Sequence, residues 1–218
     1  MPRIAIFANI DKWIFLLALV FTATIGLAGL NPYLLNGGDN AGYIAQAEGW
    51  LKLGRFANLY LIGVPVSDLK PPLFPLLLAA VEMVFGRNVS AFKAMNVLFA
   101  VASVWMAWCV LRVGLESPSD ELQPIAKQNR SALELAGLAF WFAITPSLTF
   151  YSHEVLSDIP FTFFTLAVIF FCARAARPQA SLLNLLAVAC ALLLATELRA
   201  AGIIVAGACA GYLSRNAE

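Results

Sequence analysis

Six long stretches without a single charged residue constrain the fold of this chain more than any other feature of its sequence. A helix needs roughly 20 apolar residues to cross a hydrocarbon core that is ~30 Å thick. Four of the stretches reach or approach that length, whereas 159–173 and 200–214 are short and require a thinner bilayer. The pattern predicts an all-α polytopic membrane protein with about six transmembrane helices. The expected spans are 13–38, 94–111, 135–153, 159–173, 178–196 and 200–214.

The composition supports this interpretation and excludes several classes of protein. Of the 218 residues, 61% are hydrophobic and 12% are charged, and the mean hydropathy is +0.81. Soluble domains are about 45–50% apolar and about 25% charged, so a water-soluble protein and a disordered chain are both excluded. The net charge is only +1, without the basic surface that nucleic-acid binding requires. We expect a single transmembrane domain over residues 1–218, with membrane lipids as its partners.

The first stretch follows Arg3 and Lys12, as the apolar part of a signal peptide would. It exceeds the usual apolar region of about 7–15 residues and further spans follow, so we expect an uncleaved first helix. With a cytoplasmic N-terminus, six spans place eight of the fourteen basic residues inside, in agreement with the positive-inside rule. Residues 36–93 then form the first periplasmic loop and residues 114–131 a cytoplasmic connector. The expected location is the bacterial inner membrane.

Residues 71–86 leave an alternative open, because they are apolar but short. They carry three prolines in their first five positions and contain Glu82, so they form either a seventh span or a helix in the membrane interface. A seventh span would move five basic residues in short loops to the outside, and the positive-inside rule therefore favours the interfacial helix. The choice decides whether the loop 36–93 and the loop around Asp158 share one side of the membrane.

The first outer loop carries the first group of candidate site residues. Asp39 follows two glycines at the expected N-cap of a helix whose apolar residues, Tyr43 among them, recur at helical spacing. We expect a short amphipathic helix on the membrane surface, in which Asp39 is either only a cap or also a rigidly held catalytic carboxylate. Lys70 precedes two prolines at headgroup depth. Its ammonium group is either an ordinary surface cation or a ligand for a lipid phosphate.

The second outer loop holds His153, Glu154 and Asp158 close together between two spans. Ionisable groups so near the hydrocarbon are costly and indicate function by default, although each could also be an ordinary boundary or cap residue. A metal site built from these three side chains is conceivable, but their spacing is not diagnostic. Arg199 interrupts the last apolar region beside Glu197. It either pairs with that glutamate or holds a phosphate in a bidentate manner.

Other common site motifs are missing from the sequence. There is no Gly-rich phosphate loop, nucleophile elbow, Cys/His pair or HExxH motif, so ATP-driven, serine-hydrolase and zinc-protease mechanisms are not expected. The cysteines lie inside apolar stretches without metal-ligand spacing, and we predict that they are unpaired, small buried side chains. They are Cys109, Cys172, Cys190 and Cys209.

Taken in order, these features resemble the N-terminal half of the polytopic GT-C glycosyltransferases. An aspartate soon after the first span is followed by a helix with a tyrosine and a Leu-Gly-Arg-Phe exit, and then by KPPLFPLLLA. A proline in the third span and a Ser-Asp-Ile-Pro loop complete the pattern. The sequence is most similar to the branch of protein O-mannosyltransferases and aminoarabinose transferases, which are family 39-like membrane proteins. The resemblance covers nearly all of residues 12–213.

The resemblance implies a transferase that takes a sugar from a polyprenyl- or dolichyl-phosphate donor at the outer face of the membrane. It implies that Asp39 is the general base and that Asp158 orients a substrate. Lys70 and Arg199 would bind the donor phosphate. The lipid-linked sugar is the donor substrate, and no nucleotide is needed. A divalent metal ion is possible, but no feature of the sequence supports one. Further candidates for substrate contacts are Tyr43, His153 and Glu154.

Two departures accompany the resemblance. Asn40 stands where the first-loop acid is often followed by glutamate, and members of the family run to several hundred residues with more spans. The resemblance therefore implies a fragment, a truncated relative, or one part of a complex in which a second membrane subunit supplies further helices. The acceptor is a lipid, a glycan or a protein.

Two other functions stay open at this point. A transporter would place ionisable residues at mid-membrane near broken helices, whereas here they gather at the outer boundary of the spans. A non-catalytic membrane subunit derived from the enzyme fold would keep the helices without needing the Asp39 carboxylate. In that case Asp39→Asn would leave the glycans of the cell unchanged.

Overall fold

A computed structural model gives the structure of the protein and describes residues 10–34, 39–63, 70–115, 125–177 and 180–215. Within these ranges every regular element of any length is a helix, which confirms the predicted all-α class. The helices are α2 (Ile10–Ala28), α3 (Asp39–Leu53), α4 (Leu73–Phe85), α5 (Val89–Leu115), α6 (Ile125–Ala143), α7 (Pro146–Tyr151), α8 (Asp158–Ala175), α9 (Leu182–Leu198) and α10 (Gly202–Arg215).

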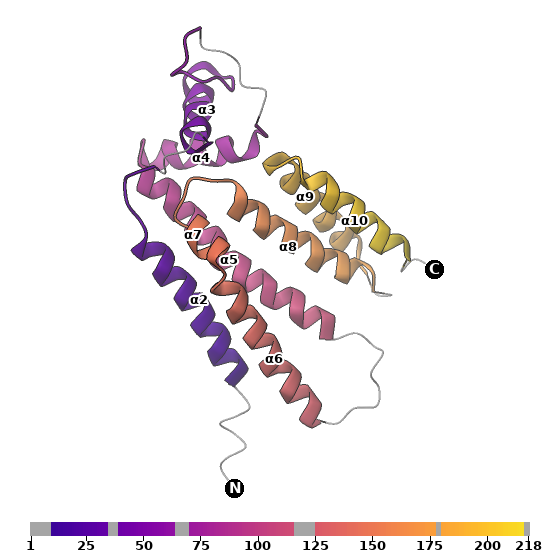
Figure 1. The fold of residues 1–218 in the computed structure, drawn as a ribbon. Helices are drawn as coiled ribbons and strands as arrows, with labels where there is room; N and C mark the ends of the chain where they lie inside the picture. The colour runs from indigo at the N-terminus through magenta and orange to yellow at the C-terminus, as the bar shows by residue number, and fades with distance from the viewer. Residues whose placement is uncertain (1–9, 35–38, 64–69, 116–124, 178–179, 216–218) are drawn as a thin grey trace.

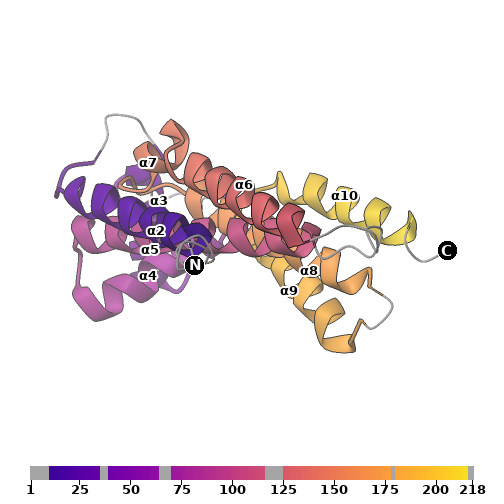
Figure 2. The ribbon, with the colours of Figure 1, turned by 90° about the horizontal axis from the view of Figure 1, so that it is seen from below.

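The long helices run back and forth and form the body of the molecule (Figure 1). α5 packs against α2 on one side and against α8 on the other, and α8 also packs against α9 and α10. Seen from below, α2 lies toward one side of the molecule, α6 crosses its middle, and α9 and α10 lie toward the other side (Figure 2). Close packing of α2 on α5 depends on Gly26, since a Cβ there would lie 2.7 Å from a methyl carbon of Val97.

Three helices are long and apolar enough to cross a membrane, namely α2, α5 and α8. The other apolar helices are shorter, and six spans are therefore not confirmed. With 17 and 14 residues, α9 and α10 extend about 26 Å and about 21 Å at a rise of 1.5 Å per residue. Large apolar side chains point outward from α2, α5 and α10, as they do on surfaces that face lipid. More than half of the surface of each of these side chains is exposed: Trp13, Leu98, Ile203 and Ile204.

The stretch 135–153 is not one continuous helix. α6 ends at Ala143 and the short helix α7 begins at Pro146, so the chain is broken at Ile144 and Thr145. The proline explains the break, because it lacks an N–H and disfavours helical backbone in the residue before it. Of the predicted connector, residues 116–124 lie outside the described part of the chain, whereas residues 125–131 form the first turns of α6.

Helix α4, which contains most of the ambiguous stretch 71–86, lies across the end of the long helices and not alongside them (Figure 1). Its 13 residues extend about 20 Å, which is too short for a span of ~30 Å. The helix follows Pro72 and ends at Phe85, before Gly86, whose φ of 66° is easily adopted only by glycine. α3 lies beyond α4, so these two helices cover one end of the bundle.

The prediction that the cysteines are unpaired is wrong for two of them. A disulfide joins Cys172 of α8 to Cys209 of α10, whereas Cys109 and Cys190 are free. The cause is the packing of α10 against α8, which brings the two Cα atoms to 6.5 Å. Two apolar stretches separated by another helix give no sign in the sequence that their cysteines face each other.

The orientation of the bundle can be tested by cysteine labelling. In a protein freed of its native cysteines, we expect Ile62→Cys and Ala200→Cys to react with a membrane-impermeant thiol reagent in intact cells. Both positions are exposed at the end that carries α3 and α4. Ala180→Cys, in the link between α8 and α9, should react only after permeabilisation. If α4 crosses the membrane, the pattern should be reversed: Ala180→Cys reacts in intact cells and Ala200→Cys reacts only after permeabilisation.

Candidate active site at one end of the bundle

The helix predicted in the first loop is confirmed as α3, but it is more deeply buried than a helix lying on a membrane surface. Its polar residues Gln46 and Glu48 are 3% and 1% exposed, whereas Trp50 lies on the outside. The reason is that the chain after α3 folds back over the helix. A Cβ on Gly49 would overlap the backbone of Ala57, so only glycine permits this approach.

Asp39 and Lys70 form an ion pair although they are 31 residues apart. The Lys70 Nζ lies 2.7 Å from the Asp39 Oδ1 and also donates to the Asp39 backbone carbonyl at 3.3 Å. The same Nζ lies 4.1 Å from the centre of the Tyr43 ring, a cation–π contact. Gly42 leaves room for it, since a Cβ there would approach Nζ to 3.1 Å. The Asp39 carboxylate nevertheless stays 70% exposed, so water and solutes reach it.

Tyr43 connects the first loop to the second. Its ring packs edge-on against Phe74 of α4, with 4.8 Å between ring centres, and its hydroxyl lies 3.1 Å from the Ser157 Oγ. Both Tyr43 and Ser157 are buried. Because Ser157 directly precedes Asp158, which begins α8, this hydrogen bond fixes α3 relative to the start of α8.

Asp158 and Arg199 form a second ion pair, between the start of α8 and the end of α9. The Arg199 Nη1 donates a hydrogen bond to the Asp158 Oδ1, so the arginine pairs with Asp158 and not with its neighbour Glu197. A tight turn follows the arginine, where a Cβ on Gly202 would lie 2.6 Å from the backbone of Thr196. The side chains of Asp158 and Arg199 are 36% and 44% exposed, so this pair is also reached from outside.

A chain of contacts connects the two ion pairs at the end of the bundle where α3 and α4 lie (Figure 1). Lys70 contacts Tyr43, Tyr43 bonds to Ser157, and Ser157 is the neighbour of Asp158 in the chain. Among the described residues the carboxylate of Asp39 pairs with Lys70 and that of Asp158 pairs with Arg199, and the two carboxylates make no contact with each other. The structure thus brings together the two predicted carboxylates and the two predicted phosphate ligands as two acid–base pairs.

Glu154 lies in the interior of the protein, 4% exposed, and is not placed to touch a substrate. Its Oε1 lies 3.8 Å from the Nζ of Lys93, which is itself 1% exposed, and its Oε2 accepts a hydrogen bond of 3.4 Å from Asn40. Lys93 also donates to Asn31 at 3.1 Å. These contacts tie α3, α5 and the second loop together, so Glu154 supports the site from within.

Sequence reasoning missed three members of this buried network. Asn96 is fully buried and donates to the backbone carbonyls of Glu154 and Leu156, at 2.5 and 2.8 Å, which holds the second loop in place. Lys93 and Asn40 supply the partners of the Glu154 carboxylate. A signal was present, because Asn96 lies in an otherwise apolar stretch and a buried amide requires hydrogen-bond partners. The sequence does not indicate which partners it finds.

His153 packs against the end of α2 and against Phe150, whose ring centre is 6.0 Å from that of the imidazole. A Cβ on Gly29 would lie 2.7 Å from the His153 ring, and the Nδ1 of His153 is buried without a partner among the described residues. The described part of the chain holds no group of three metal-binding side chains. Glu154 and Asp158 are each occupied by a cation, so the second loop does not assemble the conceivable metal site.

Glu48 is the centre of a second polar network, beside the site. It accepts a hydrogen bond of 2.6 Å from the Tyr60 hydroxyl and pairs with Arg87 at 2.9 Å and with Lys52 at 3.2 Å. The hydrogen bond to Glu48, followed by burial, raises the pKa of Tyr60. Burial, followed by the negative charge of Glu48, raises the pKa of Glu82 on α4. The network holds α3, the chain after it and α4 together.

The hydrogen bond of Tyr60 makes the free energy of unfolding depend on pH in the alkaline range. We expect the Tyr60 phenol to lose its proton with a pKa above the ordinary value of about 10. The pKa of Tyr60 is higher in the folded protein than in the unfolded chain. The hydrogen bond therefore stabilises the fold fully at pH values below the pKa of the unfolded chain, and this stabilisation is lost as the pH rises through the pKa of the folded protein. A spectrophotometric titration of the wild type minus Tyr60→Phe measures the pKa directly. Glu48→Gln should lower it, and an unchanged value in that variant would show that Glu48 is not the cause.

No protein-family model, curated protein or solved structure matches this chain. Its function must therefore be argued from the geometry of the site. Two exposed carboxylates can accept protons from a bound acceptor. The two cations bonded to them can bind an anion in their place, with Lys70 acting as a point charge and Arg199 as a bidentate donor.

Proposed function

We propose that the protein is a membrane glycosyltransferase that transfers a sugar from a polyprenyl-phosphate donor to an acceptor at the outer face of the membrane. The observation that carries the proposal is the pairing of a carboxylate with a cation twice at the same end of the bundle. The proposed reaction needs a base for the acceptor and cations for the departing phosphate, and the site offers both. The resemblance of the loop motifs to the GT-C glycosyltransferases supports the same assignment.

In the proposed reaction a hydroxyl or amine of the acceptor attacks the anomeric carbon of the donor sugar. The bond from that carbon to the phosphate oxygen breaks, its electron pair leaves with the polyprenyl phosphate, and the configuration inverts. Asp39 takes the proton of the acceptor, a contribution of about 10²–10⁴-fold for a general base. Its high exposure leaves room for an acceptor beside the Lys70 ammonium. The phosphate linkage of the donor carries the activation, so no nucleotide takes part.

Lys70 and Arg199 have the proposed role of binding the phosphate of the donor and neutralising the charge that develops as it leaves. Each already donates to a carboxylate, and a phosphate oxygen can accept the same N–H groups. Such stabilisation is largest where water is excluded. Asp158, released from Arg199 in this exchange, orients the donor sugar.

The surroundings of Lys70 suit a lipid-linked donor. Lys70 stands just before α4, which lies across the end of the bundle and ends in the exposed apolar side chains of Met83, Val84 and Phe85. A helix of this kind fits the boundary between headgroups and acyl chains. A donor could then keep its prenyl chain in the bilayer while its phosphate reaches the Lys70 ammonium.

The proposal can be tested with purified protein in liposomes. The donors are citronellyl phosphates that carry radiolabelled mannose, glucose or 4-aminoarabinose, and the acceptors are the lipids and membrane proteins of the host. We expect sugar transfer with equal release of citronellyl phosphate from at least one donor. If no donor reacts, and if Asp39→Asn leaves the glycans of the cell unchanged while deletion alters them, the protein is a non-catalytic subunit.

A further inference from the structure

A cavity of about 330 Å³ lies beside α3, on the side that faces away from the second loop. Ala41 and Ala45 line it one helical turn apart. Tyr43, which bonds to Ser157 of the second loop, lies midway between them in the sequence and so on the opposite side of the helix. The volume is at the lower end of the ~300–1,000 Å³ of ligand sites. Nothing in the proposed reaction uses this cavity.

The polar lining of the cavity comes from Arg87, Tyr60 and Asn58. The Arg87 Nε lies 2.9 Å from the Glu48 Oε1, and the guanidinium carbon lies 5.4 Å from the centre of the Tyr60 ring. Because only Nε takes part in this pairing, the N–H groups of the two terminal nitrogens can donate to a ligand. Asn58 accepts the Tyr60 backbone N–H at 3.0 Å with its side-chain oxygen, which leaves its NH₂ group as a further donor.

The charges around the cavity favour an anion. A second cation is close, since a Cβ on Gly42, which also lines the cavity, would lie 3.1 Å from the Lys70 Nζ. Within the described residues no carboxylate belongs to the lining. A phosphodiester carries one negative charge and only accepts hydrogen bonds, and arginine can bind it through two parallel N–H groups.

Two carboxylates lie close to Arg87 and neutralise its charge only in part. Glu48 is shared between Arg87 and Lys52, which lies 3.2 Å from its Oε2. Glu82 of α4 also interacts with Arg87, but burial raises the pKa of Glu82 and so disfavours its charged form. The guanidinium therefore keeps an attraction for an added anion.

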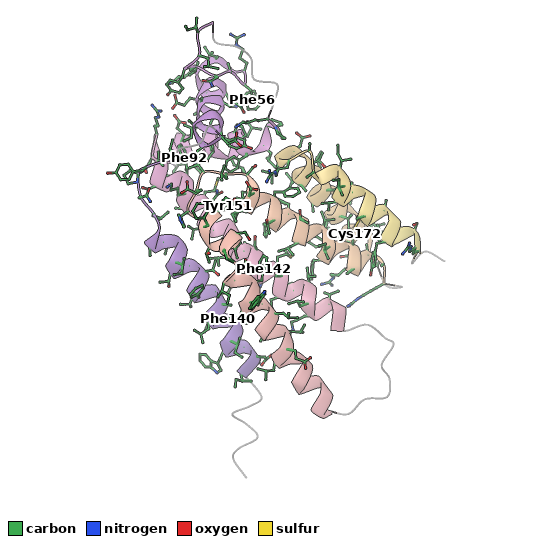
Figure 3. All side chains as sticks on the ribbon, in the orientation of Figure 1. Phe56, Phe92, Phe140, Phe142, Tyr151 and Cys172 are labelled. Atoms are coloured by element: carbon green, nitrogen blue, oxygen red, sulfur yellow. A yellow bond between two sulfur atoms is a disulfide. The ribbon has the colours of Figure 1, made fainter. Side chains whose placement is uncertain are left out.

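Arg87 lies at the boundary of the membrane. It stands two residues before Val89, the start of α5, which is long and apolar enough to cross a membrane. Phe92 in the first turn of α5 packs beside α4 (Figure 3), so the link that carries Arg87 lies where the bundle meets the first loop. More than half of the surface of the last three residues of α4 is exposed and apolar: Met83, Val84 and Phe85. A phosphate at Arg87 therefore has an apolar surface beside it.

We propose that this cavity binds the headgroup of an anionic phospholipid from the leaflet next to α4, with the phosphate at Arg87 and the acyl chains along the apolar end of α4. The inference goes beyond the proposed function, because this lipid is neither the donor nor the acceptor of the sugar. A phosphoglycerol headgroup fits best, since the ammonium of choline or ethanolamine would meet Arg87 and Lys70. The phosphate does not displace Glu48, which is paired through Nε. Bound to both Arg87 and Asn58, it joins α4 to the chain after α3.

The test is native mass spectrometry of the protein in a neutral detergent, titrated with dioleoyl phosphatidylglycerol or dioleoyl phosphatidylcholine. We expect the wild type to bind phosphatidylglycerol at least about ten-fold more tightly. Arg87→Gln should weaken this binding by about ten-fold or more, because hydrogen bonds to a charged phosphate are lost, and should leave phosphatidylcholine within about two-fold. Arg55→Gln is the matched control, since Arg55 is exposed in the same loop and lies outside the cavity lining.

A second pair of variants leaves the contacts of Arg87 in place. Ala41 lines the cavity and is exposed, so Ala41→Glu adds a carboxylate to it, whereas Ala41→Gln adds the same volume without charge. We expect only Ala41→Glu to weaken the binding of phosphatidylglycerol by about ten-fold. Equal binding of the two lipids by the wild type, or unchanged binding of phosphatidylglycerol by either Arg87→Gln or Ala41→Glu, overturns the site. Displacement of the lipid by an equal concentration of glycerophosphoglycerol, the headgroup without acyl chains, would show that the ligand is a soluble phosphodiester and overturn the lipid assignment.

Discussion

Replacing Asp39 with asparagine is expected to lower the rate of sugar transfer by about 10²–10⁴-fold, because the acceptor would lose the general base of the proposed reaction. The amide keeps nearly the same shape and can still accept a hydrogen bond from Lys70, so α3 should stay in place. The donor should therefore bind with little change in KM, and the loss should be confined to kcat. The measurement is the initial rate of radiolabel transfer in proteoliposomes at several donor concentrations.

Two companion variants make this result specific. Asp11→Asn changes a carboxylate in the first turn of α2, at the opposite end of the bundle, and should transfer sugar at the wild-type rate. Lys70→Met should instead raise KM for the donor, because it removes a phosphate ligand while leaving the carboxylate. An Asp39→Asn protein with the wild-type kcat would exclude Asp39 as the base and leave the carboxylate of Asp158 as the remaining candidate.

The second large effect is expected for stability. Lys93→Met should lower the free energy of unfolding by about 3–5 kcal/mol, because it leaves the buried Glu154 carboxylate without its cation. Lys93 is 1% and Glu154 is 4% exposed, so water cannot replace the missing charge. Unfolding in mixed micelles of increasing denaturing-detergent content, followed by tryptophan fluorescence, measures the change.

The double variant Lys93→Met/Glu154→Gln provides the control. It removes both charges and still offers an amide to Asn40, so most of the lost stability should return. If the double variant is no more stable than Lys93→Met alone, the ion pair is not the cause of the loss. Lys93 would then matter for its hydrogen bond to Asn31.

The charged residues of the two loops were predictable one at a time, but their pairing was not. Asp39 and Lys70 stand out because they border apolar stretches, as do Asp158 and Arg199. Which cation meets which carboxylate depends on how the start of α3 meets the chain before α4 and how the end of α9 meets the start of α8, over separations of 31 and 41 residues. The neighbour of Arg199 in the chain, Glu197, was an equally good partner by sequence.

Burial was the other property that the sequence could not supply. A helix pattern assigns Glu48 to the polar side of α3, yet the chain after α3 folds over it and leaves it 1% exposed. Glu154 has the position of a loop residue but the surroundings of a core residue, because Lys93 and Asn40 reach it from two other helices. Hydropathy reports how far a segment avoids water on average, and it carries no information about one polar group enclosed by others.

The two internal ion pairs have a consequence for competition by the phospholipids of the membrane. Every phospholipid carries a phosphodiester, and the bilayer holds these groups in vast excess over any rare lipid-linked sugar. Because Lys70 and Arg199 are already bonded to carboxylates, a passing headgroup must displace Asp39 or Asp158 before it can bind. A ligand that binds only through its phosphate regains little free energy from that exchange. In the proposed reaction the donor also offers a sugar that Asp158 would orient, and it would regain more, so the self-neutralised charges would keep abundant competitors out.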